Sequence, residues 1–348
     1  MGGVRGWVFY YMELQTKVNI VKSLFKINPT DRLLFVGSCF AENIGRRFVE
    51  NQFDAIVNPY GTMYNPASVL HTVERCSPSP RPHSPSPALR APSVTYSEII
   101  NLRLPQGARE KLPFAANGDD FEGSILTSSS PLGERMPVGQ VRGRSRSAFS
   151  FAIITLGTNH VYILKETDEI VDNCMKRPQK LFREEKLSVD ECADYLSRAV
   201  AILKERNSEV KVIFTVSPIR YAKYGFHGSQ LSKATLLLAV DKLVSASPES
   251  ISYFPAYEIM NDELRDYRFY QPDMLHPSEQ AVDYIYERFA ETYFSEETKA
   301  MVTEWEPIKA ALAHRPFNPD SEEHKAFLAK VTAKKENFLA KWGKSINM

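Results

Sequence analysis

Runs of consecutive hydrophobic residues mark the strands that this chain is expected to bury. Three runs have the length and the flanking residues of such strands, namely RLLFVGS (32–38), FAIITLGT (151–158) and VKVIFTVSP (210–218). A fourth run, ISYFPAYEI (251–259), is weaker. Unbroken runs of this kind are typical of parallel sheets, because both faces of such a sheet are covered. The pattern therefore predicts a mainly parallel sheet.

Segments with hydrophobic residues at helical spacing lie between these runs. They are residues 39–51, 189–206, 231–246 and 278–294, and a further helix is expected to begin near Pro66. Strands that alternate with helices predict an α/β fold with helices on both faces of the sheet. Residues 295–348 are charged and amphipathic, which predicts a C-terminal helical extension after a main domain over residues 13–294.

Residues 77–150 do not fit this alternation. Six prolines lie between Ser77 and Pro92, and large hydrophobic clusters are scarce throughout the segment. Two interpretations stay open at this point. The segment is either a disordered insertion or long loop, or part of it is not native coding sequence, for example because of a shifted reading frame.

Composition and charge restrict the class of protein. The chain has 348 residues, of which 43% are hydrophobic and 24% charged, and its formal net charge is +1. This balance is ordinary for a globular protein and argues against nucleic acid or a membrane surface as the main partner. The four cysteines have neither metal-site spacing nor a disulfide framework, so we expect a reducing, cytoplasmic setting and no metal. The N-terminal apolar stretch is too short for a good signal peptide, and Met12 is a candidate for the true start.

Ser38 follows the first predicted strand directly and begins the next helix, in VGSCFAENIG. Carboxyl ends of parallel strands are where ligands bind, so its hydroxyl is a candidate nucleophile, and its N–H could help to hold an oxyanion. The alternative is that Ser38 only caps the helix. Cys39 is a second candidate, because a thiol at a helix N-terminus can be reactive. Its side chain points elsewhere and free cysteines are usually buried, so we favour Ser38.

Two further turns carry residues that could hold an oxyanion. Gly61, in VNPYGTMYNP, allows a backbone N–H to approach a ligand closely. Asn159, in ITLGTNHVY, could donate its side-chain amide to the same oxyanion, and the neighbouring His160 is a weaker candidate. Both turns could equally be ordinary connections.

Asp273 and His276 stand three residues apart in QPDMLHPSEQA, just before a predicted helix. This spacing can place the carboxylate against one imidazole nitrogen and leave the other nitrogen for a nucleophile, which is the arrangement that activates a serine. The alternative is that both are loop residues or helix caps.

Other polar residues are candidates for contacts with a substrate. Arg220, His227 and Gln230 follow the strand of residues 210–218, and Arg177 in NCMKRP could meet an anionic group. Loop packing and surface solvation are the alternative explanation for these residues.

The order Ser, Gly, Asn and Asp-x-x-His resembles the block order of the SGNH (GDSL-like) hydrolases. The residues of the motifs resemble the GSCFA-domain family more closely still, over roughly residues 13–75 and 151–295. These motifs are GSCFAENIG, NPYGTMYNP, TLGTNHVY, TVSPIR and DMLHPSEQA. This resemblance implies a flavodoxin-like, three-layer α/β fold and an ester-hydrolysing site. Segment 77–150 departs from the family's pattern, which carries ordinary ordered sequence there.

The resemblance also assigns roles to the residues of these motifs. Ser38 would be the nucleophile, His276 the general base and Asp273 the residue that orients it. The N–H groups of Ser38 and Gly61 and the side chain of Asn159 would form the oxyanion hole.

The function that follows is a serine esterase or acyl hydrolase without metal or organic cofactor. Its substrate would be a small-molecule or carbohydrate acyl ester, with O-acetyl groups on sugars suggested by analogy alone. Two alternatives stay open: an acyltransferase that uses the same triad, and an inactive or scaffold protein that retains the fold. The sequence does not predict the oligomeric state.

Overall fold

The computed structural model describes residues 15–76, 148–174, 177–317 and 321–343. Met12 and the irregular segment, except for residues 148–150, lie outside the described residues. The predictions made for them are therefore not tested by the structure.

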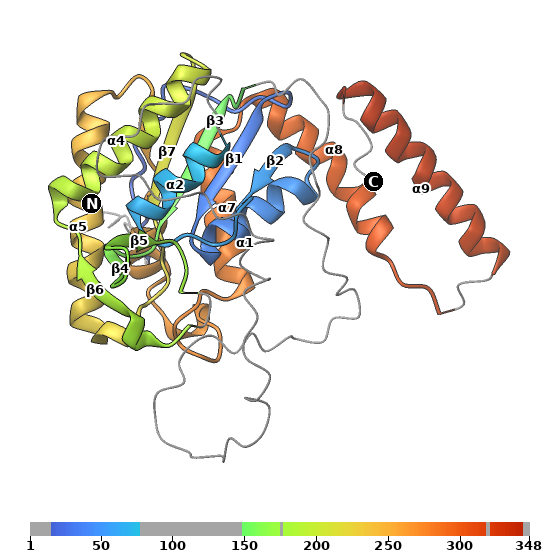
Figure 1. Cartoon of the computed structure of the whole chain (residues 1–348). Helices are drawn as coiled ribbons and strands as arrows, with labels where there is room; N and C mark the ends of the chain where they lie inside the picture. The colour runs from blue at the N-terminus through green and yellow to red at the C-terminus, as the bar shows by residue number, and fades with distance from the viewer. Residues whose placement is uncertain (1–14, 77–147, 175–176, 318–320, 344–348) are drawn as a thin grey trace, which may run out of the picture. The chain divides into compact units, whose positions relative to one another are not determined.

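A parallel five-stranded sheet forms the centre of the fold (Figure 1). Its strands are β1 (Arg32–Gly37), β2 (Asp54–Val57), β3 (Phe151–Leu156), β7 (Lys211–Val216) and β8 (Ile251–Tyr253), in the order β2-β1-β3-β7-β8. This is the strand order of flavodoxin-like doubly wound sheets. The predicted parallel α/β architecture is confirmed.

Alternation along the strands divides the core into two clusters. In β1, Leu33 and Phe35 belong to one cluster, whereas Leu34 and Val36 belong to the other. Successive side chains of a strand point to opposite faces, so an unbroken hydrophobic run fills both sides of the sheet.

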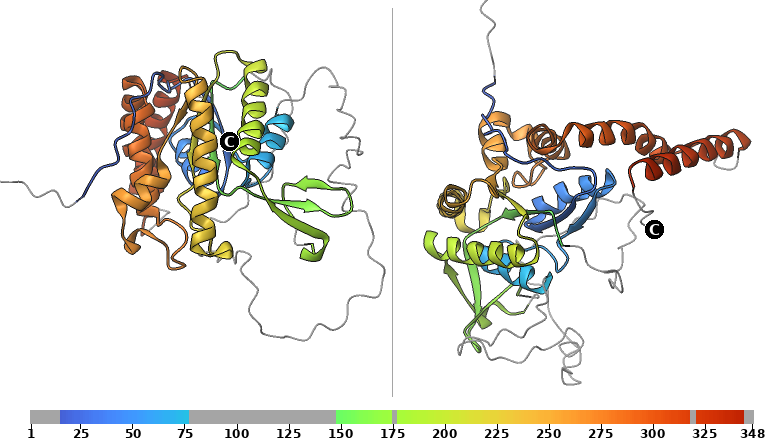
Figure 2. Two further views of the ribbon diagram at one scale, coloured as in Figure 1. Left: turned by 90° about the vertical axis from the view of Figure 1, so that its left-hand side faces the viewer. Right: turned by 90° about the horizontal axis from the view of Figure 1, so that it is seen from above.

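Helices cover both faces of the sheet (Figure 2). One cluster is completed by α1 (Cys39–Glu50), α7 (Glu279–Tyr293), α8 (Glu296–Ala313) and α9 (Glu322–Lys341). The other is completed by α2 (Pro66–Cys76), α4 (Val189–Arg206) and α5 (Gly225–Ala246). The expected helices are present, although α5 begins six residues earlier than the hydrophobic pattern suggests.

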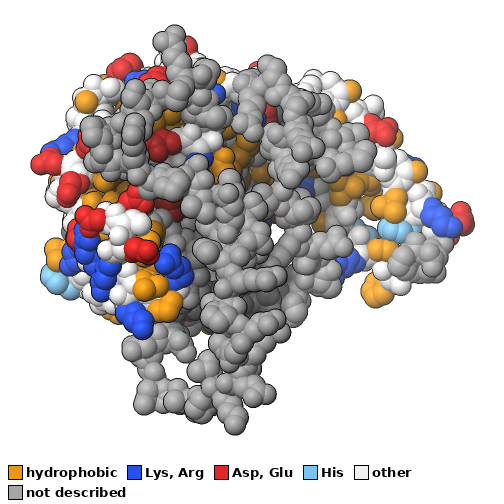
Figure 3. Space-filling model, viewed as in Figure 1, with side chains coloured by type: hydrophobic (Ala, Val, Ile, Leu, Met, Phe, Trp, Pro, Cys, Tyr) orange, Lys and Arg blue, Asp and Glu red, His pale blue; other side chains and the backbone are white. Residues whose placement is uncertain are grey.

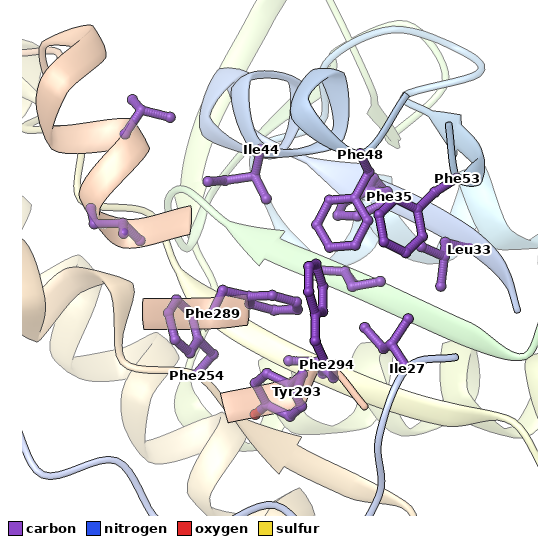
Figure 4. Close-up of a cluster of buried hydrophobic side chains, with 14 of the residues drawn as sticks. Ile27, Leu33, Phe35, Ile44, Phe48, Phe53, Phe254, Phe289, Tyr293 and Phe294 are labelled. Carbon is purple, nitrogen blue, oxygen red and sulfur yellow. The ribbon is translucent and has the colours of Figure 1, made fainter. Parts of the chain in front are cut away.

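Phe48 of α1 is the centre of an aromatic cluster on the face of the sheet that α1 and α7 cover (Figure 4). It is fully buried, and its ring centroid lies 4.9 Å from that of Phe35 and 4.8 Å from that of Phe53. The rings of Phe289 and Phe294 meet it edge-on at 5.7 Å and 5.5 Å. These contacts join α1 to the sheet and to α7.

A second, antiparallel sheet was not expected from the sequence. It has the order β5-β4-β6, with β4 (His160–Leu164), β5 (Glu169–Val171) and β6 (Phe182–Lys186). Figure 2 shows it beside the main sheet, in green. The second candidate turn thus continues into a strand that starts at His160.

The fourth predicted strand is shorter than its hydrophobic run. β8 ends at Tyr253, and the chain leaves the extended conformation at Pro255, which begins the next helical turn. The chain then forms α6 (Ala256–Glu258), the π-helix η3 (Ile259–Leu264) and the 3₁₀ helix η4 (Tyr267–Phe269). Two further 3₁₀ turns are η1 (Gln179–Leu181) and η2 (Ala222–Tyr224).

The C-terminal residues form the expected helices; α8 contacts the end of α1, and α9 packs against α8. The Trp305 indole N–H donates to the carbonyl of Glu50 at 2.7 Å, and its ring lies 4.9 Å from that of Phe338. Acidic and basic side chains are interspersed on the face drawn in Figure 3. Within the described ranges, no helix combines the length and the apolar character that a membrane span requires.

Candidate active site

Ser38 stands at the junction of β1 and α1. The preceding Gly37 has φ of +147°, and a Cβ there would lie 2.1 Å from the carbonyl oxygen of Thr155, so only glycine fits. Ser38 itself is 1% exposed, and its Oγ has no hydrogen-bond partner in the described part of the chain.

The hydroxyl of Ser38 does not cap its helix. Its backbone has the extended cap conformation, but its side chain makes no cap hydrogen bond. By contrast, Ser188 and Ser278 accept the expected backbone N–H at the starts of α4 and α7. Capping therefore does not account for Ser38, which leaves its Oγ as an uncommitted hydroxyl at the carboxyl edge of the sheet.

The turn after β2 is tied to the residue before Ser38. The N–H of Gly37 donates to Asn58 Oδ1 at 2.9 Å, and the carbonyl of Gly37 accepts the N–H of Met63 at 2.9 Å. Gly61 lies in this turn with φ of +94°, and its N–H donates to the carbonyl of Asn58 at 2.9 Å. The structure thus brings the motifs of Ser38 and Gly61 together, with the N–H of Gly61 engaged inside its own turn.

Asn159 is buried behind this turn. The N–H groups of Gly157 and Thr158 donate to the carbonyl of Tyr64 at 2.8 Å and 2.9 Å, which joins the third motif to the second. The Asn159 side-chain amide donates to the carbonyl of Leu187 at 2.6 Å. Asn159 therefore supports its turn, and the amide retains a second N–H.

Asp273 and His276 form the hydrogen-bonded pair that their spacing predicts. Asp273 Oδ2 lies 2.5 Å from His276 Nδ1, while Oδ1 accepts the N–H groups of Leu275 and His276 at 2.8 Å and 3.0 Å. Burial tends to raise the pKa of the Asp273 carboxyl, but these hydrogen bonds outweigh it and the pKa is lowered. Ser278 caps α7, so neither residue of the pair is a helix cap.

Charged side chains hold α1 against α7. Arg47, which is 8% exposed, pairs with Glu279 at 2.8 Å and with Asp283 at 2.6 Å. Burial tends to raise the pKa of Glu279, but its bonds to arginine outweigh it and lower the pKa. These pairs connect the helix that begins after Ser38 with the helix that begins after His276, although no hydrogen bond joins those two side chains in this structure.

Cys39 lies in a setting that disfavours its thiolate. The side chain is half-buried against the core cluster of α1, and burial is the main cause that raises its pKa to about 11. A thiol with this pKa is a poor nucleophile at neutral pH. This favours Ser38 over its neighbour.

Lys233 is a residue at this edge that sequence reasoning missed. It is 1% exposed, and its Nζ donates to the carbonyls of Gly157 and Ser217 at 2.7 Å and 2.8 Å. Burial lowers its pKa to about 7. Since these carbonyls directly follow β3 and β7, Lys233 holds two strand ends beside the candidate site. The sequence signal that could have identified Lys233 is its place on the hydrophobic face of the helix LSKATLLLAV, where a lysine is unusual.

Four residues were predicted to contact a substrate, and they separate in the structure. Gln230 is exposed on α5, where its side-chain oxygen accepts the hydroxyl of Tyr257. Arg220 touches the loop of the Asp273–His276 pair, because its Nη1 donates to the carbonyl of Met274 at 3.0 Å. His227 is exposed on the first turn of α5. Arg177 is exposed too and lies over the ring of Phe182 at 5.6 Å, beside the small sheet.

A metal centre is not evident at the site. Within the residues that the structure describes, no group of three or more His, Cys, Asp or Glu side chains is placed to hold a metal ion.

Family models match much of the sequence. The model of the GSCFA family matches residues 32–86 and 138–289, and that of the GSCFA domain protein C-terminal domain matches residues 305–344. No curated protein matches the chain.

Two solved structures are distantly similar. One is an acetyl esterase mutant with acetate ion, at a TM-score of 0.27 and 12% identity, over 45% of this chain and 60% of that one. The other is an acetyl xylan esterase from the rumen bacterium Butyrivibrio proteoclasticus, at a TM-score of 0.26 and 12% identity, over 41% and 36%. The chain thus spans less than two thirds of either protein.

Proposed function

The chain belongs to the GSCFA family, and from this premise we propose that it is a serine esterase of SGNH (GDSL-like) type. The observation that carries the proposal is the Asp273–His276 hydrogen bond of 2.5 Å, which fixes one imidazole nitrogen and leaves Nε2 for the proton of a nucleophile. Ser38 is the nucleophile because its Oγ neither caps α1 nor has another partner in the described ranges.

The reaction proceeds in two steps. In the first, Ser38 Oγ attacks the acyl carbonyl, His276 accepts the hydroxyl proton, and the leaving alcohol takes that proton as the ester bond breaks. In the second, water attacks the acyl-serine and gives a proton to His276, which returns it to Ser38 Oγ as the acyl–oxygen bond breaks and the acid leaves. Ser38 is 1% exposed, so an ester reaches it after a local opening of the site. Hydrogen bonds between base and nucleophile are often long without substrate and shorten when it binds.

Oxyanion stabilisation is assigned to the N–H groups of Ser38 and Gly61 and to the Asn159 amide. In the free protein these donors bond to the carbonyls of Thr155, Asn58 and Leu187, at 3.1 Å, 2.9 Å and 2.6 Å. Within the described residues the Asn159 amide donates one hydrogen bond, so its second N–H can donate without breaking the bond to Leu187. Asn159 is therefore the first donor to engage, and the two backbone donors follow if their turns move on substrate binding.

An active-site probe tests the nucleophile. A fluorophosphonate should label the wild-type protein, and Ser38→Ala should abolish labelling. The matched control is Cys39→Ala, at the adjacent position, which should keep it. Labelling that survives Ser38→Ala and disappears in Cys39→Ala would overturn the serine assignment. Absence of labelling in the folded wild type would favour the scaffold alternative.

A substrate panel tests the acyl donor. We propose O-acetyl esters of sugars as the substrate class, and the panel compares acetylated monosaccharides with p-nitrophenyl acetate and longer-chain esters. Release of acetate in water supports hydrolysis. Transfer of the acetyl group to an added alcohol, at the expense of acetate release, would support the acyltransferase alternative.

A further inference from the structure

The loop between Asp273 and His276 is a tight, strained turn. The N–H of Gln271 donates to the carbonyl of His276 at 2.7 Å, and the N–H of Met274 donates to the carbonyl of Gln271 at 2.9 Å. Met274 has φ of +58°, in the left-handed region that side-chain-bearing residues rarely adopt. A conformation of this kind persists only where the surroundings hold it.

Arg220 contacts this loop through its backbone and its side chain. Its N–H donates to the carbonyl of Leu275 at 3.1 Å, and its Nη1 donates to the carbonyl of Met274 at 3.0 Å. These two carbonyls belong to the residues that separate Asp273 from His276. Arg220 therefore fixes the peptide units whose orientation determines how the carboxylate and the imidazole face each other.

Aromatic rings fix the guanidinium of Arg220 in turn. Its Cζ lies 4.1 Å from the ring centroid of Phe226, at the start of α5, and 5.6 Å from those of Tyr267 and Tyr270, at η4. A guanidinium at these distances is attracted to the ring faces. Rings from α5 and from η4 thus hold the guanidinium in position next to the loop.

We propose that Arg220 is a positioning residue for the Asp273–His276 pair, an inference that rests on the proposed function of that pair. It differs from the substrate contact that the sequence suggests for Arg220. Placement matters because a displacement of about 1 Å in a catalytic group can cost on the order of 100-fold in rate. Loss of the Arg220 guanidinium should therefore lower kcat and leave KM nearly unchanged.

Steady-state kinetics with p-nitrophenyl acetate form the first test. Arg220→Met and Arg220→Lys should each lower kcat about 10- to 100-fold, because neither side chain reproduces the planar fork and its stacking. Guanidinium ion at millimolar concentration should restore part of kcat in Arg220→Ala. The control is Arg268→Met, since Arg268 is an exposed arginine over the ring of Phe269 at 4.9 Å. A raised KM with unchanged kcat in the Arg220 variants would overturn the proposal in favour of direct substrate contact.

Imidazole ¹⁵N NMR provides a second readout that does not require activity. The signals of His276, assigned by their loss in His276→Asn, should show one tautomer with Nδ1 protonated in the wild type and in Arg268→Met. A mixture of tautomers is expected in Arg220→Ala. An unchanged tautomer there would overturn the positioning role, whether or not the protein is an esterase. A wild type that resists fluorophosphonate would instead refute the proposed function alone.

Discussion

Lys233→Met is the substitution whose effect on stability we can work out from the structure. The change removes a buried ammonium group that donates to the carbonyls of Gly157 and Ser217 and replaces it with a side chain of similar volume. Rings of Tyr221 and Tyr257 lie 5.8 Å and 5.9 Å from Nζ. Cys39 is the neighbouring group whose charge would raise the lysine pKa, but its own pKa of about 11 keeps it neutral up to pH 9.

The sign follows from proton binding in the two states. Burial lowers the pKa of Lys233 to about 7 in the folded protein, against 10.5 for an ordinary lysine, the value taken for the unfolded chain. Below pH 7 both states hold the proton, and the full cost of the buried charge applies. Between pH 7 and 9 the folded state loses the proton while the unfolded state keeps it. The unfolded state then binds more protons, so the free energy of unfolding rises with pH, by about 2 kcal/mol over this range.

Urea denaturation at pH 7 and at pH 9 measures this effect. The free energy of unfolding of the wild type minus that of Lys233→Met should increase by about 2 kcal/mol from the lower to the higher pH. Groups common to both proteins cancel in this difference. Lys242→Met is the control, because Lys242 lies on the same helix with 55% of its side chain exposed, and its difference from the wild type should stay constant. A Lys233 difference that is also constant would refute the argument, since it would mean that burial does not perturb this lysine.

Three further predictions concern the core and the candidate triad. Gly37→Ala should prevent folding, because its Cβ would lie 2.1 Å from the carbonyl oxygen of Thr155; native-like circular dichroism in a soluble variant would contradict this. Phe48→Ala should lower the free energy of unfolding by about 3–5 kcal/mol in urea denaturation, since a fully buried ring leaves a cavity; a loss under about 1 kcal/mol would mean that the site collapses around it. Asp273→Asn should lower kcat for p-nitrophenyl acetate on the order of 10³- to 10⁴-fold, with normal far-UV circular dichroism, because an amide favours the wrong tautomer of His276; an unchanged kcat would exclude Asp273 from the triad.

Strands buried on both faces could be predicted because their sequences carry a strong local signal. β1, β3 and β7 are unbroken hydrophobic runs, and each coincides with a predicted strand to within two residues at either end. β2 is half-exposed at the edge of the sheet, and its four residues are too few to show a period. β6 has the sequence FREEK, whose pairing with β4 comes from partners distant in the chain. Such pairing leaves no mark within the strand itself.

In the candidate site, too, the contacts between residues close in sequence could be predicted, and those between distant residues could not. Asp273 and His276 are three residues apart, so their spacing alone suggested their contact. Arg220 and Met274 are 54 positions apart, and Lys233 and Gly157 are 76 positions apart, so their contacts depend on how the strands are ordered in the sheet. The residue type alone indicated that Arg220 could contact a substrate. The fold instead places its guanidinium against a loop carbonyl.

β1 determines both the packing of the core and the position of Ser38, because these residues follow one another along a single strand. Its alternation sends Phe35 to one cluster and Val36 to the other, and Gly37 and Ser38 follow at the next two positions. Insertion of one residue before Phe35 would either exchange the faces of the hydrophobic side chains before it or place a side chain where Gly37 must be bare. The position of the hydroxyl therefore cannot be adjusted independently of the packing. Variation in chemistry at this site should arise in the loops after β2, β3 and β7 and not in the strand that carries Ser38.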